Sequence, residues 1–179
     1  MRLTADWLVT LDGPPVAGAA VLLEASGRIA ALGPSALIPG LVNAHTHLEL
    51  TGLDGQVEED DFTRWIRGVR ELKAGLSPDW FRAAARQGVR DAFAAGITLV
   101  LDTGDSGAVL PALAELGGAG VAYQEVFGPD PAQCAASMAG LEAALDRQRP
   151  FCSDRVRLGL SPHAPYTVSG PLYRAAAQL

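Results

Sequence analysis

From residue 38 to the last residue, apolar runs typical of buried strands alternate with segments of helical periodicity. The predicted strands cover residues 38–47, 97–102, 120–127 and 155–160. Strands that alternate with helices form a parallel sheet. A closed (β/α)8 barrel needs eight such units and about 250 residues. This 179-residue chain has four units and stops inside a helical pattern, so we expect the N-terminal part of a TIM-type α/β barrel, or a truncated product of its gene.

The clearest predicted helix covers residues 78–95, with Ser77 as its N-cap and Gly96 at its end. Its core-facing side chains are expected to be Phe81, Ala85, Val89, Ala92 and Phe93. Its opposite stripe is expected to be solvated and consists of Arg82, Arg86 and Arg90. Further helices are predicted over residues 109–116, after Asp130, and from Ser169 onward.

Residues 1–37 have a different pattern, in which short apolar runs are separated by turns. Strands are predicted over residues 7–11, 19–24 and 28–32. These strands predict a small antiparallel, β-sandwich-like domain that precedes the barrel of residues 38–179. Three strands alone are only marginally stable, so they should pack on other parts of the protein.

Composition excludes several classes of partner. The net charge of −6 and the pI near 5.0 argue against nucleic acid, whose phosphates require a basic surface. No segment has the length and hydrophobicity of a membrane span or a signal peptide. The two cysteines are too few for a disulfide framework. We therefore expect a cytoplasmic protein with reduced thiols.

The first strand of the barrel region ends in His45-Thr46-His47. Residues i and i+2 of a strand point to the same side, so both imidazoles should face one point. Two convergent neutral imidazoles commonly begin a zinc or iron site. The alternative is that the two histidines lie on the surface by chance.

Two motifs resemble the amidohydrolase superfamily, in its deaminase and chlorohydrolase branch. The first is the run of residues 39–48 that contains both histidines, and the second is residues 158–169, which include Pro162-His163-Ala164-Pro165-Tyr166. The resemblance covers essentially the whole chain. It implies a metal-dependent hydrolase of carbon–nitrogen bonds other than peptide bonds. The expected reaction is deamination of a purine-type or other small heterocycle by metal-activated water, or dehalogenation in the chlorohydrolase case.

The resemblance also assigns roles to residues. His45 and His47 would be metal ligands, and His163 would bind substrate rather than metal; a loop histidine held by hydrogen bonds is the alternative for His163. The fourth strand, within residues 155–161, lacks the lysine that bridges two metals, so one divalent ion is favoured, zinc before iron. Asn43 also favours the deaminase side. The family's remaining ligands and its general acid/base come from later strands, so residues 1–179 alone should contain no catalytic residue and be inactive.

Four further residues are weaker substrate-binding candidates, each with a structural alternative: Glu49 (a salt bridge), Trp65 (a core aromatic), and Asp102 and Glu125 (helix caps). The segments around Glu49 and Trp65 are similar to aminodeoxyfutalosine deaminases, but S-adenosylhomocysteine-type and triazine-type relatives remain open.

Two other hypotheses compete with the enzyme. A non-catalytic half-barrel would expose apolar edges and associate with another chain or form a homo-oligomer. A small metal-binding module would use His163 as its third ligand.

Overall fold

The structure is a computed structural model that describes residues 2–4, 7–8, 13–17, 20–23, 26–32 and 39–179. The chain divides into two compact units, Met1–Leu41 and Val42–Leu179. The assignment of residues 1–37 as a separate β-sandwich-like domain stays a prediction.

The described part of the first unit consists of short antiparallel strands. A three-stranded sheet has the order β1 (Arg2–Thr4), β4 (Ala20–Leu23) and β5 (Ile29–Leu32). The second and third predicted strands are therefore confirmed as antiparallel neighbours. The first predicted strand is described only as β2 (Trp7–Leu8), which pairs instead with β3 (Val16–Ala17). Residues 9–11 of that prediction lie outside the described residues.

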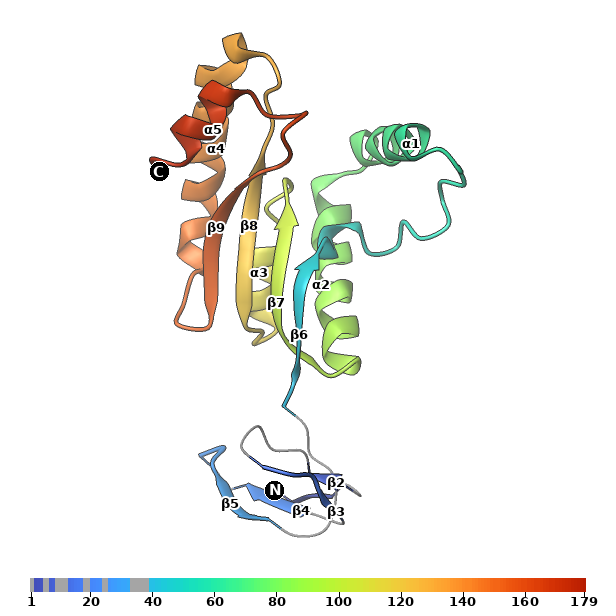
Figure 1. Ribbon diagram of the computed structural model, residues 1–179, viewed down its shortest axis with the longest axis vertical. Coiled ribbons are helices and arrows are strands. Elements are labelled where there is room, and N and C mark those ends of the chain that lie inside the picture. Colours follow the sequence, from blue (N-terminus) through green and yellow to red (C-terminus); the bar gives the residue numbers. More distant parts are fainter. Residues whose placement is uncertain (1, 5–6, 9–12, 18–19, 24–25, 33–38) are drawn as a thin grey trace. The chain divides into compact units, whose positions relative to one another are not determined.

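The second unit is built on a four-stranded sheet with the order β6-β7-β8-β9. The strands are β6 (Leu41–Thr46), β7 (Ile97–Gly104), β8 (Gly120–Val126) and β9 (Val156–Pro162). β7, β8 and β9 are parallel, and Figure 1 shows β6 beside β7, pointing the same way. The strands lie in the sheet in the same order as in the sequence, because each connection between strands leads to the neighbouring strand. The predicted α/β fold with a parallel sheet is confirmed.

The predicted helices are confirmed as α2 (Pro78–Ala94), α3 (Val109–Glu115), α4 (Cys134–Gln148) and α5 (Gly170–Ala176). The hydroxyl of Ser77 accepts from the Trp80 N–H, and Gly96 follows α2 with a φ of 79°. One core prediction is wrong, because Phe93 is 41% exposed. Phe93 follows Ala92 in the sequence, but its side chain lies outside the buried stripe of α2.

Helix α1 (Phe62–Ala74) is not predicted by the sequence analysis. The Asp61 carboxylate caps its first turn by accepting from the Arg64 N–H at 2.9 Å. None of the helix's residues is fully buried. The chain leaves η1 (Leu48–Leu50), a short 3₁₀ turn after β6, and passes through a loop before it enters α1 (Figure 1).

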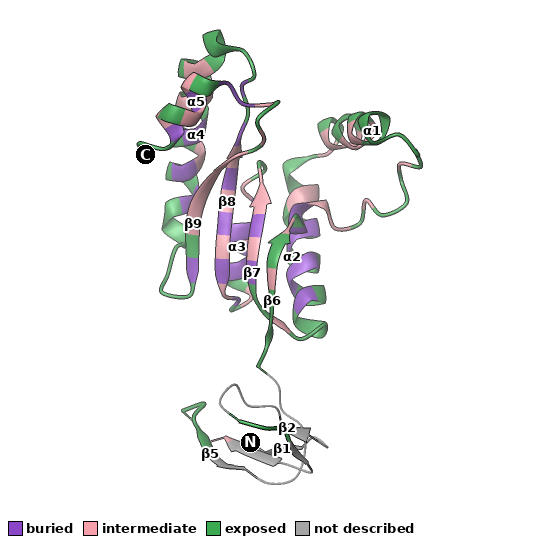
Figure 2. Ribbon diagram, viewed as in Figure 1, coloured by how far each residue is buried: buried purple, intermediate pink, exposed green. Residues whose placement is uncertain are grey.

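Burial alternates along β8 and shows which side of the sheet the helices cover (Figure 2). Ala122, Gln124 and Val126 are buried, whereas Tyr123 and Glu125 are only half-buried. The buried set packs with the helix layer, where Leu110 and Leu113 of α3 belong to the main core. The odd-numbered side chains of β8 therefore occupy the uncovered face, which corresponds to the interior of a barrel.

Candidate metal and substrate site

The two histidines predicted to bind metal lie at the C-terminal end of β6. Their ring centroids are 5.1 Å apart, with the ring planes at 86°. The backbone N–H of His45 donates to the Asn43 side chain at 3.2 Å. Both histidines are exposed. The alternation of β6 thus brings the imidazoles together, as the His-x-His spacing predicts.

The ring of His47 is held by the neighbouring strand. Its Nδ1 donates to the backbone carbonyl of Thr103 in β7 at 2.7 Å, since a carbonyl can only accept. In the neutral ring this bond places the proton on Nδ1 and leaves Nε2 with a free lone pair. A hydrogen bond from the second ring nitrogen to a backbone carbonyl is the usual way in which a metal-binding histidine is oriented.

The donor set fits a divalent metal as two of its ligands, with further ligands required. Catalytic zinc typically has three protein ligands. Among the described residues, which include all three histidines, no three His, Cys, Asp or Glu side chains are placed to hold a metal together. This arrangement does not support the alternative in which His163 completes a self-contained metal site.

His163 follows the end of β9, in the loop that leads to α5. Its backbone N–H donates to the Val126 carbonyl at 3.3 Å. The Thr167 hydroxyl donates to the Ala164 carbonyl, so it accepts from His163 Nδ1, at 2.8 Å. The ring also lies against Phe127, with centroids 4.7 Å apart. His163 is therefore an exposed, well-oriented imidazole whose Nε2 is available.

Glu125 lies on the uncovered face of β8, one residue before the strand ends. Burial raises the pKa of its carboxyl above the ordinary value, and the charges of His163 and His47 oppose that rise. Glu125 is thus electrically coupled to both histidines. Of the four weaker candidates, its position fits substrate contact best.

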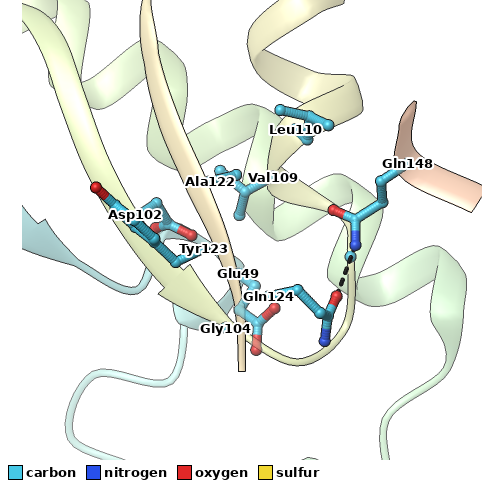
Figure 3. A pocket seen from close by; sticks show the side chains of 10 residues that line it. Glu49, Asp102, Gly104, Val109, Leu110, Ala122, Tyr123, Gln124 and Gln148 are labelled. Atoms are coloured by element: carbon cyan, nitrogen blue, oxygen red, sulfur yellow. Dashed lines mark hydrogen bonds between the residues drawn. The ribbon is translucent and has the colours of Figure 1, made fainter. Parts of the chain in front are cut away.

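Glu49 and Asp102 instead lie in the buried layer between the sheet and the helices. Each is 1% exposed. Together with Gln124 and Gln148 they line a cavity of about 10 Å³, at most the space that one water molecule needs (Figure 3). The amide of Gln148 donates to that of Gln124 at 2.6 Å. This placement favours structural roles over substrate contact, and for Glu49 it favours the salt-bridge alternative.

Trp65 lies on α1, where its ring is 6.0 Å from that of Phe62. The tryptophan is 39% exposed and Phe62 is 63% exposed. Neither aromatic is part of the described core, so the core alternative for Trp65 is wrong.

Asp102 should make stability depend on pH. Burial raises the pKa of Asp102 to about 8, with a further contribution from the negative charges of Glu49 and Glu125, whereas the hydrogen bond from the Leu48 N–H opposes that rise. From about pH 4 to about pH 8 the folded state therefore retains a proton that the unfolded chain has lost. The free energy of unfolding should fall as pH rises through this window. One pKa unit corresponds to about 1.4 kcal/mol, so Asp102→Asn should remove a decline of at least that size.

Urea unfolding of the wild type and Asp102→Asn at pH 5 and pH 7.5 measures this difference. Asp79→Asn is a suitable control, because the Asp79 side chain is 86% exposed. Equal pH slopes for the wild type and Asp102→Asn would contradict the expectation.

Gly104, at the end of β7, leaves room for the Glu49 carboxylate. A Cβ at this position would lie 2.6 Å from Glu49 Cδ. Because the buried Glu49 cannot move without losing its hydrogen bonds, Gly104→Ala should lower the free energy of unfolding by about 1–3 kcal/mol. Gly140→Ala in α4 is the matched control, because a Cβ there meets no atom within 4 Å. Thermal or urea unfolding of both variants tests the prediction, which fails if they are equally stable.

Comparison with known proteins agrees with this geometry. Residues 36–179 match the amidohydrolase family. The chain belongs to that family. The predicted resemblance is thereby confirmed.

The relatives of this amidohydrolase are named as deaminases. A 5-methylthioadenosine/S-adenosylhomocysteine deaminase from Nitratidesulfovibrio vulgaris is 32% identical over 98% of this chain and 40% of its own length. An aminodeoxyfutalosine deaminase from Deinococcus radiodurans is 32% identical over 77% of this chain and 32% of its own length. The chain thus spans about two fifths or less of the length of these curated relatives.

A solved structure supports the fold. An adenosine deaminase from Xanthomonas campestris with bound zinc superimposes with a TM-score of 0.82 at 20% identity, over 99% of this chain and 46% of that chain. The predicted TIM-barrel type of α/β fold is confirmed, and the chain covers about half of that structure. Within the described residues, no helix is long and apolar enough to cross a membrane.

Two contributors to the site are absent from the sequence analysis. Lys73, the only lysine of the chain, forms an ion pair with Glu49. Thr103 acts through its backbone carbonyl, which side-chain patterns cannot reveal. A lone lysine in an arginine-rich chain is a weak signal that could have drawn attention to Lys73.

Proposed function

We propose that the complete protein is a metal-dependent aminohydrolase that removes an amino group from an adenosine-type nucleoside or a related heterocycle. The observation that carries the proposal is the paired His45 and His47 at the end of the first barrel strand of an amidohydrolase. The names of the relatives, which are deaminases of adenosine-type compounds, support the substrate class.

In this proposal His45 and His47 are two ligands of a single divalent ion, zinc before iron. A bound ion of this kind lowers the pKa of its water toward about 7 and so supplies a nucleophile at neutral pH. His163 and Glu125 contact the substrate in this proposal, which is supported by the position of Glu125 on the uncovered face of β8 and by the influence of both His163 and His47 on its carboxyl group. The oriented Nε2 of His163 can donate or accept a hydrogen bond to a ring nitrogen or an exocyclic group.

The acidic composition and the two free cysteines, Cys134 and Cys152, support a cytoplasmic location with no nucleic-acid or membrane partner. Cys152 is exposed, which suits a reducing compartment.

Association with another polypeptide is a second candidate property, and one observation favours it. Leu41 and Val42 of β6 are 52% and 58% exposed, and Leu99 of β7 is 36% exposed. Exposed apolar side chains on a sheet commonly mark surfaces that other protein segments cover. Light scattering of residues 1–179 and of the complete gene product tests this. A homo-oligomer is expected if these residues pack between copies, whereas a monomeric state of both would argue against it.

The function is tested by metal analysis and ammonia release in the complete gene product. About one zinc per chain is expected, together with turnover of adenosine, 5-methylthioadenosine, S-adenosylhomocysteine or aminodeoxyfutalosine. Chloride release from a chlorinated triazine would instead identify a dehalogenase. Metal-loaded protein that acts on none of these compounds would contradict the proposed substrate class.

A further inference from the structure

Two buried carboxyl side chains link the ends of β6 and β7, one from each strand end. Asp102 of β7 accepts from the backbone N–H of Leu48, which follows β6, at 2.7 Å. Glu49, which also follows β6, accepts from the backbone N–H groups after β7, at 3.4 Å from Asp105 and 3.0 Å from Ser106. We refer to Asp102, Glu49 and these three backbone bonds as the reciprocal clamp.

His47 lies inside the reciprocal clamp. Leu48, whose N–H is held by Asp102, is the next residue along the chain. Thr103, whose carbonyl accepts from His47 Nδ1, comes directly after Asp102 and two residues before Asp105. The backbone on both sides of the His47–Thr103 bond is therefore fixed by a buried carboxyl side chain, Asp102 on the His47 side and Glu49 on the Thr103 side.

Lys73 connects the clamp to α1. Its ammonium lies 2.9 Å from Glu49 Oε1 and 2.5 Å from Asp105 Oδ1. It also lies 5.8 Å from the centroid of the Phe81 ring in α2. The Ser106 hydroxyl donates to the second carboxylate oxygen, Oε2. Both oxygens of the buried Glu49 are thus satisfied, and Lys73 provides the compensating charge.

We propose that the reciprocal clamp positions His47. Glu49 holds the Asp105–Ser106 backbone so that the Thr103 carbonyl remains aimed at His47 Nδ1, and Lys73 holds the Glu49 side chain in place through their ion pair. The consequence is a His47 ring whose Nε2 is presented as the metal-binding atom before any metal arrives. This inference rests on the ligand role of His47 in the proposed function, but its primary readout does not require metal or substrate.

Glu49→Gln is the decisive variant. The glutamine has the same shape, but its amide nitrogen is a donor and cannot accept from the donors that surround the carboxylate. Nitrogen NMR of metal-free, histidine-labelled complete protein distinguishes the two tautomers of each ring. Wild-type His47 should be protonated on Nδ1 only, whereas Glu49→Gln should show a mixture. Zn²⁺ affinity should fall about 10- to 100-fold, as is typical when a partner of a metal ligand is removed.

His163 provides an internal control within the same spectrum. Its Nδ1 is held by Thr167, which has no bond to the clamp. The tautomer of His163 should therefore be unchanged in Glu49→Gln. Unchanged His47 tautomer and Zn²⁺ affinity in the folded variant would overturn the proposal, as would a parallel change at His163, since that change would indicate a general loss of structure.

If Glu49→Gln does not fold, Ser106→Ala removes one hydroxyl donor to Glu49 and leaves the charges intact. A smaller shift of the His47 tautomer in the same direction supports the proposal, and no shift overturns it. The two proposals fail separately. A protein without deaminase activity whose His47 tautomer responds to Glu49→Gln would refute only the substrate class, whereas an active deaminase with an insensitive His47 would refute only the clamp.

Discussion

Replacement of His47 by alanine is expected to weaken Zn²⁺ binding to the complete protein by more than about 100-fold, because loss of the partners of a ligand alone costs about 10- to 100-fold. The substitution removes an imidazole that lies beside His45, with ring centroids 5.1 Å apart. Catalytic zinc sites have few protein ligands, so each contributes strongly. Competition with a chromophoric chelator measures the affinity, and ammonia release should be lost in parallel.

His163→Ala is the matched control for this experiment. His163 is likewise exposed and oriented through Nδ1, but it forms no metal-binding group with the other described His, Cys, Asp and Glu residues. The variant should retain its zinc and lose turnover through weaker substrate binding. A full equivalent of tightly held zinc in His47→Ala, or loss of zinc in His163→Ala, would contradict the assignment of ligands.

Lys73→Met should be the most damaging substitution of a charged residue for stability. The Lys73 side chain is 23% exposed and its partner Glu49 only 1% exposed, so the substitution leaves a buried carboxylate without a counter-charge. Breaking a buried pair in this way typically costs 3–5 kcal/mol. Glu49 keeps its donors at Asp105 and Ser106, so we expect a loss near the lower end, about 3 kcal/mol in the free energy of unfolding. Urea unfolding at pH 7 provides the measurement.

The pH dependence of this pair follows from its charges. Burial alone would lower the pKa of Lys73, but the charge of Glu49 and the bonds to Asp105 raise it above the ordinary value of 10.5. A group whose pKa is raised by folding stabilises the protein below its unfolded pKa and loses that contribution only as pH rises through the folded value. The effect of Lys73→Met should therefore be nearly constant between pH 6 and pH 9.

Arg82→Met breaks an exposed ion pair and is the control for the loss of a positive charge. Arg82 and its partner Asp79 are 56% and 86% exposed, and exposed pairs contribute about 0–1 kcal/mol. Lys73→Met combined with Glu49→Gln should recover part of the lost stability, because no unpaired buried charge remains. If Lys73→Met costs no more than Arg82→Met, the buried ion pair does not stabilise the fold as proposed.

The main elements of the barrel region follow from local patterns in the sequence. A cap at Ser77 and a buried stripe through Ala85 and Val89 specify α2, because helix ends and faces depend on residues one or two turns apart. Helix α1 also carries such a local pattern, with Asp61 as its cap and an apolar stripe of Phe62, Trp65, Ile66, Val69 and Leu72. The pattern does not indicate that none of these residues becomes fully buried, because burial depends on what packs against the stripe.

Part of the candidate site can likewise be predicted from local sequence patterns. The spacing of His45 and His47 determines that their rings share a side, since side chains alternate along a strand. The partnership of Lys73 and Glu49 spans 24 residues and depends on how α1 returns to the sheet. No local periodicity encodes such a contact.

The sequence by itself determined the parallel α/β architecture, the family and the convergence of two histidines at the end of β6. The tertiary structure decided which carboxyl side chains lie on the same side of the sheet as the two histidines and which lie on the other. Asp102 and Glu125 look equivalent in sequence, each near the end of an apolar strand. Asp102 shares the helix-covered face with Ala122, opposite it in β8, whereas Glu125 has the uncovered side. Only the packing of helices on one side of the sheet distinguishes the buried Asp102 from the half-buried Glu125 on the uncovered face.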